Sequence, residues 1–126
     1  MRIMTQMHME QAMDIKKGII VRPYWADLIL CGDKTWEIRG SNTQIRGIVK
    51  IIKSRTGMIY GEAELYDAFP LTKELFHENY DKHRVDRLSG MLGYETPYAW
   101  VFRNAEKYDQ PIPYQRKPGQ VIWVNF

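Results

Sequence analysis

The sequence of 126 residues predicts an α+β fold, a small mixed β-barrel of about five to six strands with two to three flanking helices. Short apolar runs with the alternation of strands recur along the chain, whereas only two segments have the spacing of helices. No repeat or Pro/Gly-rich linker divides the sequence. A doubly wound sheet fits poorly, because it would need a helix between nearly every pair of strands.

Composition is that of a globular domain, with 44% hydrophobic and 26% charged residues. The single cysteine, Cys31, excludes an internal disulfide framework and a cysteine-rich zinc site. No apolar run approaches the roughly 20 residues that span a bilayer. The N-terminal residues also lack the apolar core of a secretory signal. We therefore expect a cytoplasmic protein without a membrane partner.

The N-terminal region is expected to be peripheral. Methionines at helical spacing are as consistent with a short packed helix as with a frayed tail. We therefore expect an N-terminal extension over 1–16, helical or frayed, and a single domain over 17–126. The first strand should cover 18–21, where Pro23 ends it.

The first helix is expected over 25–31, where apolar residues recur at helical spacing. Gly32 follows at the C-terminal position that favours glycine. Two strands should come next, over 35–39 and 45–54, the second rich in isoleucine and valine.

The clearest alternation spans residues 58–69 and predicts a strand with one wet face. The apolar parity holds Ile59, Ala63, Leu65 and Phe69, and the polar parity holds Glu62, Glu64 and Tyr66.

The charged segment over 72–92 is expected to be helical, with Thr72 as its N-cap. A strand should follow, in which alternating aromatic residues face the core; these are Tyr98, Trp100 and Phe102. We expect a loop to contain Pro111, Pro113 and Pro118, and a last strand over 121–126.

Charge is unevenly distributed along the chain. From Lys16 to Tyr60 there are nine basic and three acidic residues, although the whole chain carries a net charge of only +3. If the fold gathers these residues on one side, the resulting field attracts phosphates. Alternatively, the lysines are solvated on strand edges, where they discourage aggregation.

The segment over 23–39, PYWADLILCGDKTWEIR, resembles the signature of the ASCH (activating-signal-cointegrator homology) family. That signature is a Pro/Trp-Ala helix followed by Gly-x-Lys-x-x-Glu-x-Arg. The resemblance extends over 18–126 and is weakest over 72–92. Its later features are Arg46-Gly47, Gly57, Gly61, Tyr98-Ala99-Trp100 and Trp123.

The resemblance implies a barrel similar to the PUA fold, with a cleft between the first helix and the barrel mouth. Its relatives commonly bind RNA, and several recognise modified bases. It therefore implies RNA or a modified nucleotide as the partner, with DNA also possible, and no cofactor. The sequence leaves the oligomeric state open.

Lys34, Glu37 and Arg39 are the central candidates for such a cleft. Glu37 and Arg39 are two residues apart on a strand and therefore leave the same face. A cation, a carboxylate and a guanidinium together can grip a phosphate and hydrogen-bond a base edge. The alternative is an ion pair that only stabilises the end of the barrel.

Neighbouring side chains complete the predicted site. Tyr24 is the better candidate for stacking on a base, because Trp25 can equally be a core anchor of the helix. Cations and a hydroxyl near the strand ends are suited to phosphate contacts, although they can also be solvated. The residues expected to bind the ligand are Arg22, Tyr24, Trp25, Lys34, Glu37, Arg39, Arg46, Lys53 and Ser54.

A hydrolase is the alternative function. Some ASCH proteins resemble amidohydrolases of acetylated cytidine, which use a lysine, a threonine three residues later and a distant glutamate. Lys34 matches the lysine, but Glu37 replaces the threonine, and Glu78 is a weak match for the glutamate. In an enzyme, Lys34 and Glu37 would be the catalytic pair that handles protons.

Two further possibilities stay open. In a ribonuclease-like reaction, Tyr24 and Lys34 would stabilise charge on the phosphate. A protein-interaction domain would keep the barrel without using the cleft. No metal site is expected, since His8, His77 and His83 lack the spacing of metal ligands.

Overall fold

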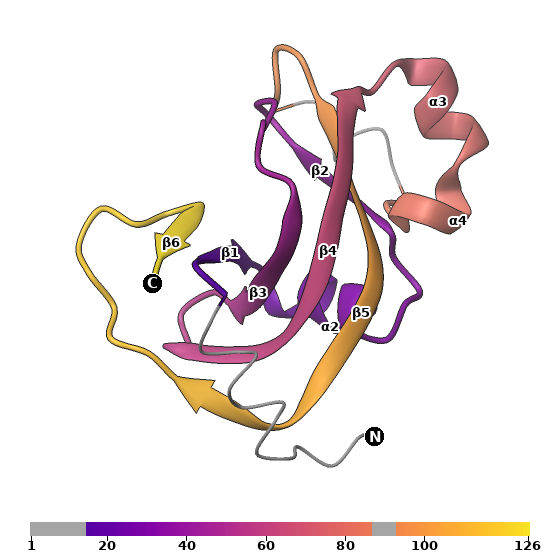
Figure 1. Cartoon of the computed structure of the whole chain (residues 1–126). Coiled ribbons are helices and arrows are strands. Elements are labelled where there is room, and N and C mark those ends of the chain that lie inside the picture. The colour runs from indigo at the N-terminus through magenta and orange to yellow at the C-terminus, as the bar shows by residue number, and fades with distance from the viewer. Residues whose placement is uncertain (1–14, 87–92) are drawn as a thin grey trace.

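The computed structural model describes residues 15–86 and 93–126 (Figure 1). Its strands form one six-stranded sheet in the order β2-β5-β4-β3-β1-β6. Neighbouring strands are antiparallel, apart from the parallel pair β1 and β3. The described elements are β1 (Lys17–Val21), α2 (Pro23–Leu30), β2 (Trp36–Arg39), β3 (Gly47–Lys53), β4 (Met58–Pro70), α3 (Lys73–Glu78), α4 (Tyr80–His83), β5 (Tyr98–Pro113) and β6 (Trp123–Asn125).

The sheet curls into a half-barrel, as the long bent strands β4 and β5 show in Figure 1. Three irregularities in the pairing of β4 with β5 supply local bends. With six strands and three described helices, the α+β prediction is confirmed. Arg39 on β2 donates a hydrogen bond to the Ile20 carbonyl on β1, 2.8 Å away, and so links two strands that are not paired in the sheet.

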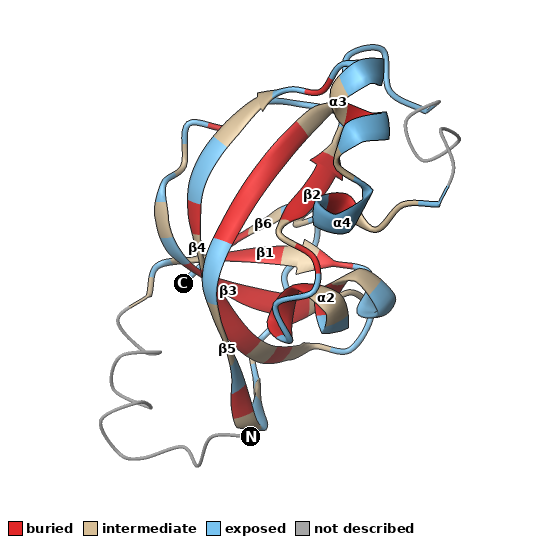
Figure 2. Cartoon of the chain, turned by 90° about the vertical axis from the view of Figure 1, so that its right-hand side faces the viewer, coloured by how far each residue is buried: buried red, intermediate tan, exposed pale blue. Residues whose placement is uncertain are grey.

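Helix α2 packs on the concave face of the sheet, and Figure 2 shows buried residues on the helix and on the strands beside it. Pro23 begins the helix, two residues before the predicted start, and Gly32 follows its end with φ of +87°, at the predicted C-terminal position. The helix buries Ala26, Ile29 and Leu30 against apolar residues of β1, β3, β4 and β5. This helix therefore anchors the chain immediately before the signature strand.

A second apolar cluster holds α3 and α4 against β2 and the start of β5. Phe76 is buried there beside Trp36 and Val101. The Thr72 hydroxyl accepts a hydrogen bond from the Leu75 amide, which confirms the predicted N-cap.

Two predictions about strand boundaries and faces are wrong. Glu62 is buried rather than wet, because the Tyr108 hydroxyl donates a hydrogen bond to its carboxylate at 2.8 Å. Pro111 and Pro113 lie within β5 rather than in a loop. β5 pairs with β2 only over Tyr98–Val101, so its later residues have an unpaired edge where proline is tolerated.

The predicted helical segment over 72–92 is only partly described. It forms two short helices separated at Asn79, and residues 87–92 lie outside the described residues. The predicted helix or frayed tail also falls mostly on residues 1–14, which are not described. The division into 1–16 and 17–126 therefore stays a prediction. None of the described helices is long and apolar enough to cross a membrane.

Candidate functional site

A cavity of about 720 Å³ opens beside α2, between β1, β2 and the turn after β3. This volume lies within the usual range for small-molecule sites in proteins. Among the described residues, its charged lining consists of one carboxylate, Glu37, and four cationic side chains: Arg22, Lys34, Arg39 and Arg55.

Lys34, Glu37 and Arg39 meet at this cavity. The Arg39 guanidinium pairs with the Glu37 carboxylate at 3.0 Å, and the Lys34 ammonium lies 3.6 Å from the other carboxylate oxygen. The common face predicted for Glu37 and Arg39 is confirmed by this contact. All three groups line the same cavity, although they differ in their access to solvent.

Lys34 is the most buried of the three, with 1% of its surface exposed. Burial lowers its pKa from 10.5 to about 8, whereas the nearby Glu37 carboxylate raises it and limits the shift. The ammonium is therefore mostly protonated at pH 7 but loses its proton at a much lower pH than an exposed lysine. It forms a cationic floor to the cavity.

His83 contacts the Lys34 ammonium. The sequence analysis did not identify this residue as part of the site. Its carbonyl accepts a hydrogen bond from the Lys34 ammonium at 2.5 Å, and its ring stacks on Phe76. The ring is fully buried; Nδ1 accepts from the Val85 amide, so Nε2 carries the proton and donates to the Phe76 carbonyl. The relevant group is a backbone carbonyl, which no side-chain pattern reveals.

Burial lowers the pKa of His83 below its ordinary value of 6.5. The unfolded chain therefore binds a proton more readily than the native ring, so stability should fall as the pH drops through about 6.5. We expect His83→Ala to lower the free energy of unfolding at pH 7 by about 2 kcal/mol. Between pH 7 and 5.5, we also expect the free energy of unfolding to decline less in this variant than in the wild type.

Urea unfolding at several pH values measures this effect. His77→Ala is the matched control, because His77 is exposed on α3, and it should keep both the stability and its pH dependence. Identical pH profiles for His83→Ala and the wild type would contradict the assignment.

Trp25 and Tyr24 have different surroundings. Trp25 is half-buried and lines the cavity, with the Lys34 ammonium 4.5 Å from its ring centroid. Tyr24 is 65% exposed and does not line the cavity, although its ring packs edge-on against Trp25. The geometry therefore favours Trp25 over Tyr24 as the aromatic surface of the site.

Arg55 is a cation of the rim and belongs to the segment over 53–55, whose cations and hydroxyl were expected to suit phosphate contacts. It lies in the turn after β3 with φ of 66°, a left-handed conformation that non-glycine residues rarely adopt. Ser54 precedes it and also lines the cavity, as Arg22 does at the start of α2. Tyr94, from the segment before β5, adds a second ring that the sequence analysis missed.

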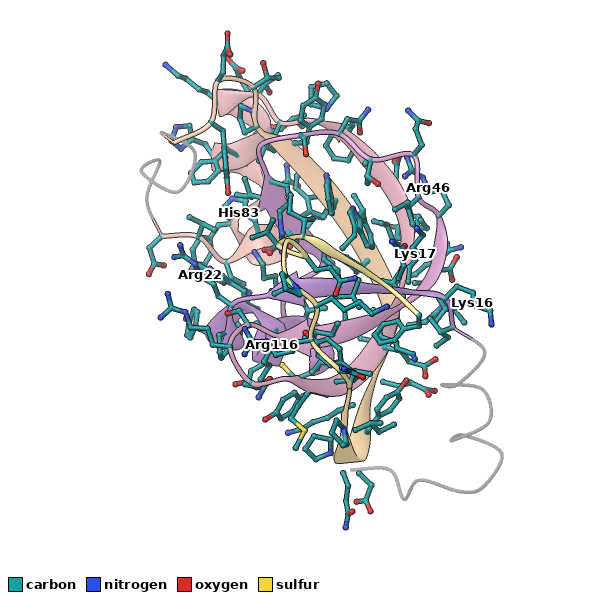
Figure 3. The ribbon with its side chains drawn as sticks, turned by 90° about the vertical axis from the view of Figure 1, so that its left-hand side faces the viewer. Lys16, Lys17, Arg22, Arg46, His83 and Arg116 are labelled. Carbon is teal, nitrogen blue, oxygen red and sulfur yellow. The ribbon has the colours of Figure 1, made fainter. Side chains whose placement is uncertain are left out.

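Besides Tyr24, three residues named by the sequence lie outside the cavity lining. Lys53 pairs with Asp27 at 2.6 Å. Arg46 donates hydrogen bonds to the carbonyls just before β3, and Figure 3 shows it on the opposite side of the view from Arg22 and His83. Glu78, considered for an amidohydrolase, is exposed on α3 and also lies outside the lining.

No metal site was found over residues 15–86 and 93–126, where no three His, Cys, Asp or Glu side chains are grouped to hold an ion.

The curled half-barrel and the cavity beside its first described helix define a PUA-like domain. Comparison with family models identifies the particular family: the model of the ASCH domain matches residues 19–112. The chain therefore belongs to the ASCH domain family. Membership of this family supports the general assignment of a nucleic-acid-related domain.

Solved structures of the same fold agree. The chain is similar to the ASCH protein from Zymomonas mobilis, with 18% identity, a TM-score of 0.69, and coverage of 87% of this chain and 86% of that one. A tyrosine-to-phenylalanine variant of that protein gives 18% identity and a TM-score of 0.70, covering 87% and 88%. No protein of curated function matches the sequence.

Proposed function

We propose that this domain binds RNA, or a nucleotide with a modified base, in the basic cavity beside α2. The observation that carries the proposal is that Trp25, Lys34, Glu37 and Arg39 line one cavity of nucleotide-compatible size. Family membership supports the nucleic-acid class, and the cavity chemistry supports the choice of site.

Each group has a role that its chemistry permits. The Trp25 ring offers an apolar surface for a base, an interaction worth about 1–3 kcal/mol per base. The Glu37 carboxylate accepts hydrogen bonds from exocyclic amines, and the Arg39 guanidinium donates in a planar fork. Arg22 and Arg55 are placed at the rim to contact phosphates.

A matched pair of arginines tests the location. Arg22 and Arg46 are both exposed, but only Arg22 lines the cavity. We expect Arg22→Ala to weaken binding of a fluorescent single-stranded RNA and to reduce the slope of log affinity against log salt by about one. Arg46→Ala should change neither quantity appreciably.

Fluorescence anisotropy between 50 and 200 mM salt measures both quantities, with single-stranded DNA of the same sequence as a second probe. If Arg46→Ala weakens binding as much as Arg22→Ala, the cavity is not the site. If affinity does not depend on salt, phosphate recognition is also excluded.

A hydrolase is the second candidate, favoured by one observation. The pKa of Lys34 is lowered to about 8, close to neutrality, and its ammonium lies 3.6 Å from Glu37. Such a pair can exchange protons with a substrate. Incubation with acetylated cytidine and with labelled RNA, using the wild type beside Lys34→Met, tests this function; product formation that is equal in both proteins would reject the pair.

A further inference from the structure

A second cavity of about 200 Å³ adjoins the first. Four residues line both cavities, namely Ile20, Ser54, Arg55 and Val121. The two cavities are therefore adjacent, so one extended ligand that occupies both would contact this shared wall.

The second cavity has the charge pattern of an anion site. Of the described residues that line it, three are cationic, namely Arg55, Arg116 and Lys117, and none carries a carboxylate. None of these cations forms an ion pair with a residue in the described part of the chain. Their charges are thus available to an external anion.

The backbone around these cations is fixed by hydrogen bonds. The Ser54 amide donates to the Val21 carbonyl at 2.8 Å, which holds the turn in which Arg55 adopts its left-handed conformation. The Tyr114 amide donates to the Gly57 carbonyl at 3.1 Å, which ties the chain after β5 to the same turn. Retention of a strained residue at a cavity wall is typical of functional sites.

Arg116 is packed directly against this turn. A Cβ atom added at Gly57 would lie 3.4 Å from the Arg116 Cδ, so the arginine stem passes close to the glycine. A Cβ at this distance would make an ordinary van der Waals contact with the stem, and Arg116 itself lines the cavity.

Gln120 adds a polar group that has no partner among the described residues. Its Oε1 atom is buried and accepts no hydrogen bond there. Buried acceptors are ordinarily satisfied, and Gln120 lines the second cavity, where a donor on a bound ligand can supply the missing hydrogen bond. A sugar hydroxyl is a donor of the required kind.

We propose that the second cavity binds the phosphate and sugar of the nucleotide that adjoins the one in the first cavity. The ligand is then a single strand of at least two nucleotides rather than a free nucleoside. This inference rests on the proposed function, since it assigns the first cavity to a nucleotide.

The test compares uridine monophosphate with a uridine trinucleotide by NMR titration or calorimetry. We expect the trinucleotide to bind at least tenfold more tightly to the wild type. The double variant Arg116→Ala/Lys117→Ala should lose about tenfold in trinucleotide affinity and keep its affinity for the monophosphate. Lys107→Ala, an exposed cation on β5 that lines neither cavity, is the matched control and should leave both affinities unchanged.

Equal affinity for the two ligands would overturn the second site, as would a double variant that weakens both ligands equally or neither. Lys34→Met separates this failure from failure of the proposed function. Suppose that Lys34→Met weakens binding of the monophosphate, but the trinucleotide binds the wild type no more tightly than the monophosphate does. Only the second site is then rejected. If Lys34→Met leaves both affinities unchanged, the first cavity itself is not the nucleotide site.

Discussion

Replacing Lys34 by methionine should weaken binding of a single-stranded RNA by about a hundredfold at pH 7. The ammonium is buried at the floor of the cavity, where a charge is poorly screened and its loss typically costs about 2–5 kcal/mol of binding. Methionine keeps most of the side-chain volume, so the cavity should retain its shape.

The same residue should give binding a characteristic pH dependence. Because the pKa of Lys34 is about 8, its protonated fraction falls about tenfold between pH 7 and pH 9. An anionic ligand favours the protonated form, so wild-type affinity should decline by up to about tenfold over this range. Ordinary lysines, with pKa values near 10.4, stay protonated for most of this range.

Fluorescence anisotropy across this pH range provides the measurement, and Lys34→Met should give a nearly flat profile. The variant should remain folded, because the depressed pKa means that burying the ammonium opposes folding at neutral pH. Glu37 keeps Arg39 as its partner. A variant that binds as tightly as the wild type, with the same pH profile, would contradict the role of Lys34.

Gly61→Ala should lower the free energy of unfolding by about 3–4 kcal/mol. A Cβ atom at this position would come within 2.3 Å of the Glu106 carbonyl oxygen and 2.5 Å of the Leu30 Cδ2. The carbonyl belongs to the backbone of β5, so it cannot move aside as a flexible side chain could. Gly61 therefore permits the close approach of β4 and β5 under α2.

Denaturant unfolding measures this loss. Gly93→Ala is the matched control, because an added Cβ there meets no atom of the described residues within 4 Å and the backbone is outside the left-handed region. Gly93→Ala should leave the free energy of unfolding nearly unchanged. If Gly61→Ala proved as stable as Gly93→Ala, the tight packing of these two strands would be contradicted.

The sequence predicted the fold well where local pattern and tertiary packing agree. The helix before Gly32 and the N-cap at Thr72 are where the local signals placed them. The prediction of Glu62 failed because its burial depends on Tyr108, which is 46 residues away and supplies the hydrogen bond. Pairing of this kind is invisible to an alternation pattern read along one strand.

The sequence predicted only those parts of the site that follow from local pattern. Glu37 and Arg39 share a strand, so their common face follows from the backbone period of two. Arg46 and Lys53 were named on local grounds, but they hydrogen-bond or pair elsewhere. His83 acts through its carbonyl, which no residue-type pattern can identify.

The second cavity lay beyond the reach of the sequence. It depends on the turn after β3 meeting the chain after β5, which brings Arg55 and Arg116, 61 positions apart in the sequence, to one cavity. Only the curl of the sheet produces that contact, because the two segments share no local pattern.

The most direct test of the account is a crystal structure of the protein with a short single-stranded RNA. We predict a nucleotide in the 720 Å³ cavity, with its base against Trp25 and its polar groups on Glu37 and Arg39. An RNA bound elsewhere on the surface, with that cavity left to solvent, would contradict it.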